Sequence, residues 1–141
     1  MQITKLQQAH TDIIFELFKE QFIDDLWSKK DIIESFNNKV ISFYGIFDKD
    51  KLVCVCSILE TLDDINLLKI ATKHEYKKMG FAKNLLQFLI SLKKQNQTFS
   101  LEVKSQNVPA IKLYESLGFK TLHIRKRYYK NGDDALCMFL Q

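Results

Sequence analysis

Stretches rich in β-branched and aromatic residues, separated by turn residues, recur along the chain and are typical of strands. Asp48-Lys49-Asp50 joins two of them as a hairpin, Asp63-Asp64 makes the next turn, and Asn131-Gly132 makes the last one. We therefore predict strands over residues 2–6, 40–47, 51–60, 65–72, 98–103, 119–125 and 135–140.

In other segments the apolar residues recur at the 3.6-residue spacing of an amphipathic helix. The first helix is predicted from about residue 11, with Thr11 or Asp12 as its cap. Residues 24–28 break its pattern, and Ser28 is expected to cap a second short helix that carries Ile32 and Phe36.

Two more helices are predicted in the second half of the chain. One runs from Gly80 to about Lys93, and the other follows Asn107 and stops at Gly118, a residue suited to a left-handed helix cap. The resulting order is β-α-α-β-β-β-α-β-α-β-β. This order predicts an α/β fold, a mixed sheet with helices on its faces.

Length and composition favour one domain over residues 1–141, because 46% hydrophobic and 27% charged residues fit a single globular core. No apolar run approaches the roughly 20 residues that span a bilayer, and the N-terminus lacks a secretory signal. We therefore expect a cytoplasmic protein without membrane contact. The formal charge of +4 suits a phosphate-bearing cofactor but is too small for a dedicated nucleic-acid binder.

The three cysteines predict neither a disulfide framework nor a zinc site, because their number is odd and no CxxC spacing occurs. Cys54, Cys56 and Cys137 are interpreted as small buried apolar residues in a reducing compartment. No pattern places any of them beside a histidine as a nucleophile pair, and no metal site is predicted. The histidines are expected at surface or edge positions: His10, His74 and His123.

The segment from Tyr76 to Lys83 joins a predicted strand to a predicted helix. At such a junction, free backbone N–H groups and the helix dipole can hold a phosphate, and lysines add positive charge. Neither the P-loop pattern nor the GxGxxG pattern of dinucleotide sites is present. From the residues alone, a phosphate site and an ordinary charged connection are equally open.

Within this segment, Lys77-x-x-Gly80-x-Ala82 is similar to the acetyl-CoA loop R/Q-x-x-G-x-G/A of the GCN5-related N-acetyltransferase superfamily. Three further elements resemble its RimI-type ribosomal-protein alanine N-acetyltransferases. Residues 101–119 resemble LEVRxSNxxAxxLYExLGF, residues 26–28 resemble PWS, and residues 125–138 resemble RRNYYxxxxEDAxxM. The resemblance covers nearly the whole chain and implies the acyl-CoA N-acyltransferase fold of that superfamily.

The resemblance implies acetyl-CoA as the cosubstrate and no metal. The implied cofactor contacts are a strand end, the loop and a helix cap: Ile70, Ala71, Thr72, Lys77, Lys78, Met79, Gly80, Phe81, Ala82, Lys83 and Asn107. The implied acceptor contacts are aromatic: Trp27, Tyr128 and Tyr129. Without the resemblance, residues 70–72 would be interpreted as a plain core strand.

The resemblance also makes Glu102 the general base and Tyr114 the acid that protonates the departing CoA thiolate. Strand alternation points Glu102 away from the core side of Leu101 and Val103. An α-amine with a pKa near roughly 8 is mostly protonated at neutral pH, so a carboxylate must accept a proton before direct attack on the thioester. Spacing alone favours a solvated strand carboxylate for Glu102, and equally allows a packing aromatic for Tyr114.

The implied reaction transfers acetyl to the N-terminal α-amine of a protein, alanine or serine on a small-subunit ribosomal protein. The alternatives are an acetyltransferase for protein lysine or a small amine, and a non-catalytic acyl-CoA-binding sensor or adaptor. The presence of both Glu102 and Tyr114 favours an enzyme. The expected partner is the acceptor protein, without direct nucleic-acid contact, and the expected state is a monomer or weak dimer.

Overall fold

A seven-stranded mixed sheet forms the centre of the computed structural model, which describes residues 2–22 and 25–141. The strand order across the sheet is β1-β2-β3-β4-β5-β7-β6, and β4 and β5 are its parallel pair. The strands are β1 (Ile3–Lys5), β2 (Ile41–Asp48), β3 (Lys51–Glu60), β4 (Asp64–Thr72), β5 (Thr98–Lys104), β6 (Lys120–Arg125) and β7 (Ala135–Leu140). The predicted mixed sheet and order of elements are confirmed.

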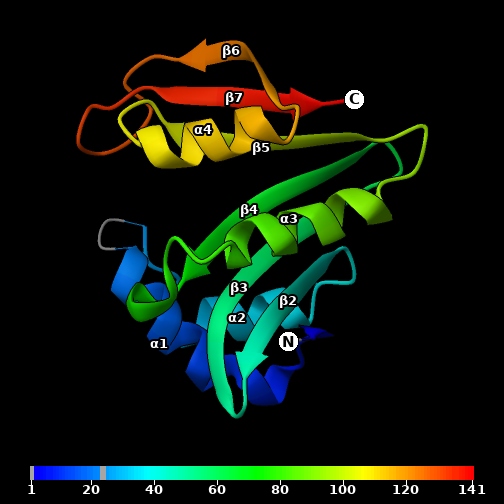
Figure 1. The fold of residues 1–141 in the computed structure, drawn as a ribbon, viewed down its shortest axis with the longest axis vertical. Helices are drawn as coiled ribbons and strands as arrows, with labels where there is room; N and C mark the ends of the chain where they lie inside the picture. Colours follow the sequence, from blue (N-terminus) through cyan, green and yellow to red (C-terminus); the bar gives the residue numbers. More distant parts are fainter. Residues whose placement is uncertain (1, 23–24) are drawn as a thin grey trace.

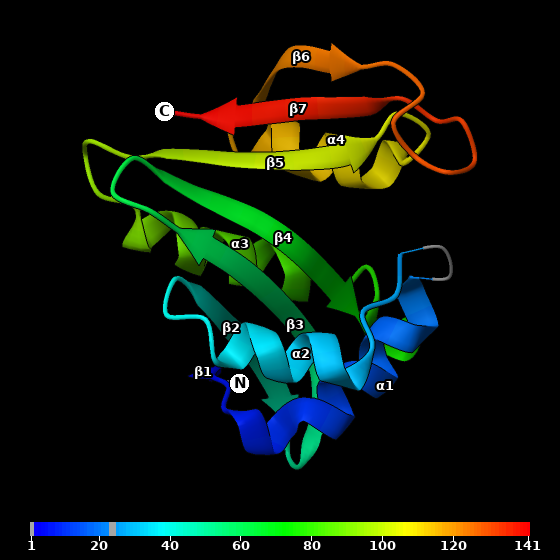
Figure 2. The same cartoon turned by 180° about the vertical axis from the view of Figure 1, so that it is seen from behind.

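The helices cover the two faces of this sheet in pairs (Figures 1 and 2). They are α1 (Thr11–Gln21), α2 (Lys29–Phe36), α3 (Phe81–Leu92) and α4 (Val108–Ser116), with 3-10 turns η1 (Gln8–His10) and η2 (His74–Tyr76). One buried cluster joins α1 and α2 to the sheet through Phe18, Ile32 and Phe43. The other joins α3 and α4 to it through residues such as Leu86 and Phe99, so each face has its own core.

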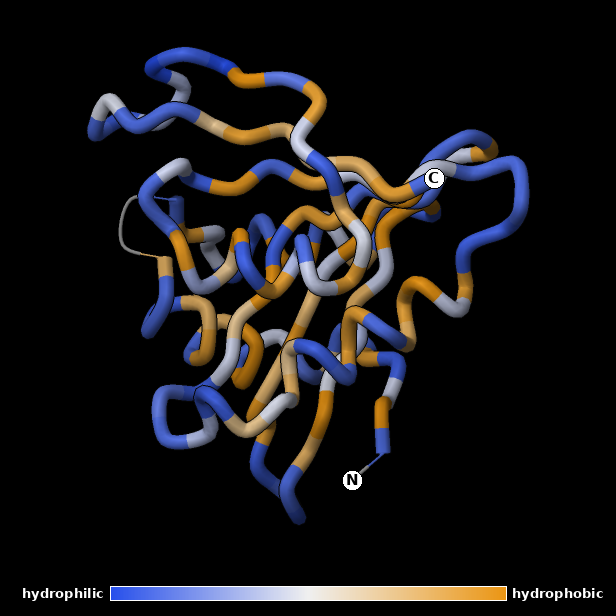
Figure 3. The backbone as a smooth tube through the Cα atoms, turned by 45° about the horizontal axis from the view of Figure 1, so that its top comes forward, coloured by the Kyte–Doolittle hydropathy of each residue, from blue (hydrophilic) through white to orange (hydrophobic). Residues whose placement is uncertain are grey.

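Polar connections surround this apolar interior. In Figure 3 the hydrophobic colour concentrates in the strands and the inner sides of the helices, and the turns are hydrophilic. Cys54, Cys56 and Cys137 are buried free cysteines, as predicted. Burial raises the pKa of the Cys54 thiol to about 11 and raises that of Cys56 as well, so both stay protonated at neutral pH. These two thiols therefore pack as small apolar groups.

The helix starts agree with the predicted caps in two places and differ in one. Ser28 forms a capping box with Asp31, and the Asn107 side chain accepts a hydrogen bond from the Ala110 N–H at 3.3 Å. The prediction that Thr11 or Asp12 caps α1 is wrong, because η1 runs directly into the helix and Thr11 is already helical. Its hydroxyl instead donates to the Gln8 carbonyl at 2.6 Å. Asp24, where we predicted the break after α1 to begin, lies outside the described residues.

A bulge in β4 separates the ends of β4 and β5. Ser57 pairs with Lys69 and Ile58 pairs with Leu67, so Leu68 is an extra residue in the ladder with β3. The parallel ladder with β5 runs from the pair Asp64–Thr98 to the pair Leu67–Leu101, which ends it at the bulge. A bulge bends its strand, and in both ribbon views β4 and β5 diverge beyond this point (Figures 1 and 2). We call residues 69–72 of β4 and 102–104 of β5 the splayed ends.

Candidate active site

The loop that follows the splayed end of β4 has the geometry of an anion site. Lys78 and Gly80 both have positive φ, +64° and +88°, and α3 begins at Phe81 with its first internal hydrogen bond from Asn84 N–H to the Gly80 carbonyl. The N–H groups that precede Asn84 at the helix start therefore have no acceptor within the helix and point out of its N-terminal end. A Cβ placed on Gly80 would meet no atom within 4 Å, so the backbone faces open space. The loop fits a pyrophosphate in shape and charge.

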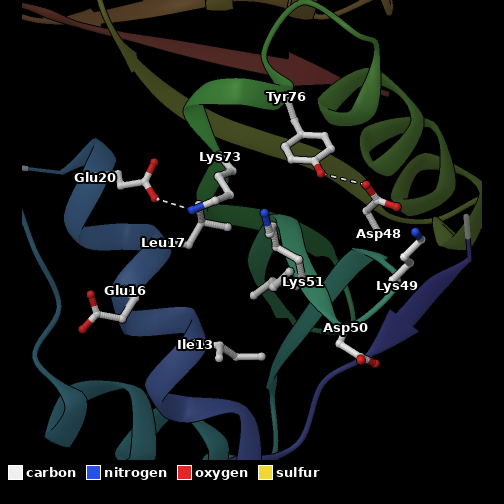
Figure 4. A pocket seen from close by; sticks show the side chains of 11 residues that line it. Ile13, Glu16, Leu17, Glu20, Asp48, Lys49, Asp50, Lys51, Lys73 and Tyr76 are labelled. Atoms are coloured by element: carbon white, nitrogen blue, oxygen red, sulfur yellow. Dashed lines mark hydrogen bonds and ion pairs between the residues drawn. The ribbon is translucent and has the colours of Figure 1, made fainter.

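The root of this loop is tied to the α1 side of the molecule (Figure 4). The Tyr76 hydroxyl donates to Asp48 Oδ2 at 2.7 Å, and Lys73 Nζ lies 3.1 Å from Glu20 Oε2. These contacts border an open pocket of about 620 Å³ between α1 and the β2–β3 turn. Most of its lining is charged, and none of the residues predicted for cofactor, acceptor or catalysis belongs to it. The residues predicted for the active site therefore lie outside this pocket.

The predicted strand contacts lie at the splayed end of β4. Ala71 is buried and pairs with Val55 of β3, while Ile70 and Thr72 are half-buried on the α3 face. Their other backbone edge faces β5, and the hydrogen-bonded ladder between the two strands ends at Leu67. An unpaired edge of this kind can hydrogen-bond an extended amide-bearing ligand.

Glu102 emerges from the splayed end of β5 on the face opposite α3 and α4, as alternation predicts. Leu101 and Val103 are buried, whereas Glu102 is exposed. Its Oε2 lies 2.8 Å from Arg125 Nε of β6 and accepts a hydrogen bond from the Cys137 thiol of β7 at 3.6 Å. The ladder between β6 and β7 places His123 opposite Cys137, a pairing that the sequence pattern did not predict.

Tyr114 lies on α4 and belongs to the buried cluster that includes Leu101 and Val103 of β5. The residue is 6% exposed, and its ring packs edge-on against Phe119 with ring centroids 6.0 Å apart. Burial, and to a lesser degree the nearby Tyr129, raises the pKa of Tyr114 to about 12. Burial and then the charge of Glu102 likewise raise the pKa of Tyr129 to about 12. Both phenols therefore stay protonated at neutral pH.

The predicted acceptor residues come from two separate segments. Tyr128 and Tyr129 stack edge-on at 5.2 Å in the β6–β7 connection, with Lys104 Nζ 5.1 Å from the Tyr129 ring centre. Trp27 is half-buried and packs edge-on against Phe18 and Phe43 at 6.0 and 6.3 Å, so much of its ring belongs to the core. The charge of Asp25, two residues before Trp27, contributes to the raised pKa of Tyr129.

Lys69 was not singled out by the sequence pattern, although it anchors the Trp27 segment. Its side chain is 3% exposed, and its ammonium donates to the Asp25 carbonyl at 2.7 Å and to Asp25 Oδ2 at 2.9 Å. It also lies 4.2 Å from the Phe22 ring centre and 5.2 Å from that of Trp27. The sequence did hold a signal for this role, because Lys69 interrupts a row of apolar alternate residues in its strand: Ile65, Leu67 and Ala71.

The described residues contain neither a metal-binding cluster nor a helix that could span a membrane. No group of three or more histidine, cysteine, aspartate or glutamate side chains in residues 2–22 and 25–141 is arranged to hold a metal ion. Within the same residues, no helix has the length and apolar character needed to cross a membrane.

Comparison with known proteins agrees with this geometry. The model of the FR47-like protein family matches residues 43–129. The [ribosomal protein bS18]-alanine N-acetyltransferase of Escherichia coli K12 is 34% identical over 119 residues, which cover 81% of this chain and 80% of the relative. The crystal structure of the ribosomal-protein-S18-alanine N-acetyltransferase from Escherichia coli superposes with a TM-score of 0.89 at 28% identity, over 99% of this chain and 92% of that one.

A more distant structure, solved with acetyl-CoA, shares the fold. Arabidopsis thaliana NAA60, solved in complex with acetyl-CoA, superposes with a TM-score of 0.87 at 14% identity, over 99% of this chain and 97% of that one. The family match, the identity to the bacterial enzyme and the shared fold agree with one another. The chain therefore belongs to the RimI-type ribosomal-protein alanine N-acetyltransferases of the GCN5-related N-acetyltransferase superfamily.

Proposed function

We propose that the protein transfers acetyl from acetyl-CoA to the N-terminal α-amine of a small-subunit ribosomal protein, with alanine or serine as its first residue. The observation that carries the proposal is that the splayed end of β5 bears an outward carboxylate, Glu102, while α4 supplies a phenol, Tyr114, that stays protonated at neutral pH. The relatives named for acetylation of alanine on ribosomal protein bS18 support this acceptor. We propose one acetyltransferase domain over residues 1–141, working in the cytoplasm as a monomer or weak dimer.

Acetyl-CoA supplies the acetyl group as an activated thioester. In our proposal the backbone N–H groups of residues 78–83 hold its pyrophosphate, and the lysines of the loop add positive charge. The free edge of residues 70–72 and the Asn107 amide hold the pantetheine arm. The positive φ of Gly80 and the open space around it support close approach of a phosphate to the backbone.

Glu102 prepares the acceptor and Tyr114 completes the transfer. The carboxylate accepts a proton from the N-terminal ammonium, which frees the nitrogen lone pair for attack on the thioester carbon. The nitrogen forms its bond to the carbonyl carbon, the carbon–sulfur bond breaks, and the Tyr114 hydroxyl gives its proton to the thiolate. The second proton on the new amide nitrogen then passes to the Tyr114 phenolate and restores the phenol. Because the pKa of Tyr114 is raised to about 12, the phenol still carries that proton at neutral pH.

The deciding experiment is incubation of the protein with acetyl-CoA and a panel of N-terminal peptides, read by mass spectrometry. We expect one acetyl group on the α-amine of peptides that begin with alanine or serine. Acetylation of an internal lysine, or of spermidine added as a small amine, would instead establish the alternative acceptors. Binding of acetyl-CoA without transfer to any acceptor would identify a sensor.

Gly80→Glu is expected to weaken acetyl-CoA binding about tenfold, because it adds left-handed strain and a negative charge where the pyrophosphate is proposed to bind. Isothermal titration calorimetry measures this change. Gly132→Glu is a matched control, since Gly132 also has a positive φ, +91°, and no atom within 4 Å of an added Cβ, but lies in the β6–β7 connection. Equal affinities of the two variants would refute the loop as the phosphate site.

Tyr129→Ala removes one aromatic contact to the acceptor and is therefore expected to raise the KM for an N-terminal peptide several-fold. The KM for acetyl-CoA is expected to stay unchanged. Lys130→Ala removes the exposed neighbouring side chain and serves as its control.

Trp27→Ala is expected to raise the peptide KM and also to lower the melting temperature, because its ring packs in the core. Trp27→Phe keeps most of that packing and separates the two effects.

A further inference from the structure

Two groups converge on a single oxygen of the Glu102 carboxylate. Arg125 Nε lies 2.8 Å from Oε2, and the Cys137 thiol donates to the same atom at 3.6 Å. Among residues 2–22 and 25–141, no hydrogen bond or ion pair is found on Oε1. The carboxylate is therefore held from one side, with its second oxygen free.

The strand register fixes this arrangement. Glu102 pairs with Cys137 across β5 and β7, and Arg125 pairs with Ala135, two residues earlier along β7. Arg125 thus reaches Glu102 diagonally across the intervening strand, on the sheet face that faces the viewer in Figure 2, where no described helix covers β5, β7 and β6. The Tyr128 ring centre lies 5.4 Å from the guanidinium carbon, within the range of a cation–π contact.

The ion pair between Arg125 and Glu102 contributes little to the free energy of folding. The Arg125 side chain is 54% exposed and that of Glu102 is 32% exposed, and ion pairs at this degree of exposure add little stability. Hydrogen bonding to Cys137, and then the charge of Glu102, raises the pKa of Arg125 above its ordinary value, so the guanidinium stays charged throughout the working range. A permanent cation on one oxygen of the proposed base is more useful for orientation than for stability.

We propose that Arg125 is a positioning residue for the reaction, which fixes Oε2 of Glu102 and presents Oε1 to the acceptor amine. The inference rests on the proposed function, in which Glu102 is the base. In the step itself, the N–H bond of the ammonium breaks, the proton passes to Oε1, and the electron pair stays on nitrogen. Arg125 neither gives nor takes a proton and acts only through Glu102.

The test replaces Arg125 by glutamine and by lysine and measures kcat and KM with an N-terminal alanine peptide. Arg125→Gln is expected to lower kcat about tenfold, within the range for a displaced catalytic group, with unchanged melting temperature and acetyl-CoA affinity. Arg125→Lys keeps the charge and is expected to restore most of the rate. Lys126→Gln is the matched control, because Lys126 is the next cation in the chain but pairs with Asp134 at 3.4 Å.

A measurement without acetyl-CoA accompanies the kinetics. In protein labelled with ¹³C at glutamate side-chain carboxyls, the Glu102 signal, assigned from its loss in Glu102→Gln, is expected to move in Arg125→Gln and to stay in Lys126→Gln. In the Glu102→Gln background, Arg125→Gln is expected to lower kcat no further. An unmoved signal, an unchanged or higher kcat in Arg125→Gln, or a full additional loss in the double variant would overturn the positioning role.

Failure of the proposed function gives a different pattern. If Glu102→Gln itself turns over the peptide at the normal rate, Glu102 is not the base, and any slowing by Arg125→Gln then has another cause, which also overturns the inference. If the wild-type protein acetylates no α-amine, the proposed function fails, and the ¹³C signal alone decides whether Arg125 holds the Glu102 carboxylate. The two failures are therefore distinguishable.

Discussion

Glu102→Gln lowers the turnover number for an N-terminal peptide about a hundredfold in our expectation, and leaves the affinity for acetyl-CoA unchanged. The amide has the shape of the carboxylate but cannot accept a proton from the acceptor ammonium. Glu102 projects from the splayed end of β5 on the face opposite α3 and α4, away from the loop proposed to hold the cofactor. Steady-state kinetics and calorimetry on the same preparation separate the two effects.

The pH dependence of the rate gives a second test of Glu102 as the base. An N-terminal amine has a pKa near roughly 8, so above pH 9 most acceptor molecules need no base. The rate ratio of wild type to Glu102→Gln is therefore expected to be largest near neutral pH and to shrink toward pH 9.5. Glu34→Gln, which removes an exposed carboxylate paired with Lys30 on α2, should behave as wild type at every pH. A fully active Glu102→Gln across neutral pH would assign the base elsewhere, such as to a water held by backbone carbonyls.

Local patterns in the sequence were sufficient to predict the elements of the fold and the outward direction of Glu102. Alternation along one strand decides which face a side chain takes, and capping depends on residues three positions apart, as at Ser28 and Asn107. Both are short-range properties of the chain. The resemblance to a known family then gave these residues roles that spacing alone did not favour.

The contacts made across strands were not predictable in this way. The pairing of Glu102 with Arg125 depends on β7 lying between β5 and β6, an order that periodicity does not specify. The bulge at Leu68 depends on the register between β3 and β4, and it occurs in a stretch that reads as ordinary strand. The 3-10 turn before α1 was not predicted either. It takes the place of the expected cap because the chain is already helical where α1 begins.

Tyr114→Phe is expected to slow acetyl transfer about a hundredfold while the fold and the cofactor affinity stay unchanged. The ring would still pack against Phe119 in the core. Among the described residues the Tyr114 hydroxyl forms no hydrogen bond to a protein group, so its removal leaves no partner unsatisfied and the melting temperature should not move. Because the pKa of Tyr114 is raised to about 12, the phenol stays protonated up to about pH 10. In that pH range, its ionisation should not reduce the wild-type rate.

Tyr44→Phe is the matched control for this experiment. Tyr44 is half-buried on β2, its ring packs against Phe88 with centroids 5.4 Å apart, and burial raises the pKa of its phenol too, but it lies outside the splayed ends. If packing alone explained Tyr114, both variants would turn over normally, and any change would be in the melting temperature. A slow Tyr114→Phe beside a normal Tyr44→Phe, at equal acetyl-CoA affinity, assigns the lost rate to the missing proton donor. Normal turnover by Tyr114→Phe would mean that the thiolate leaves without assistance from this hydroxyl.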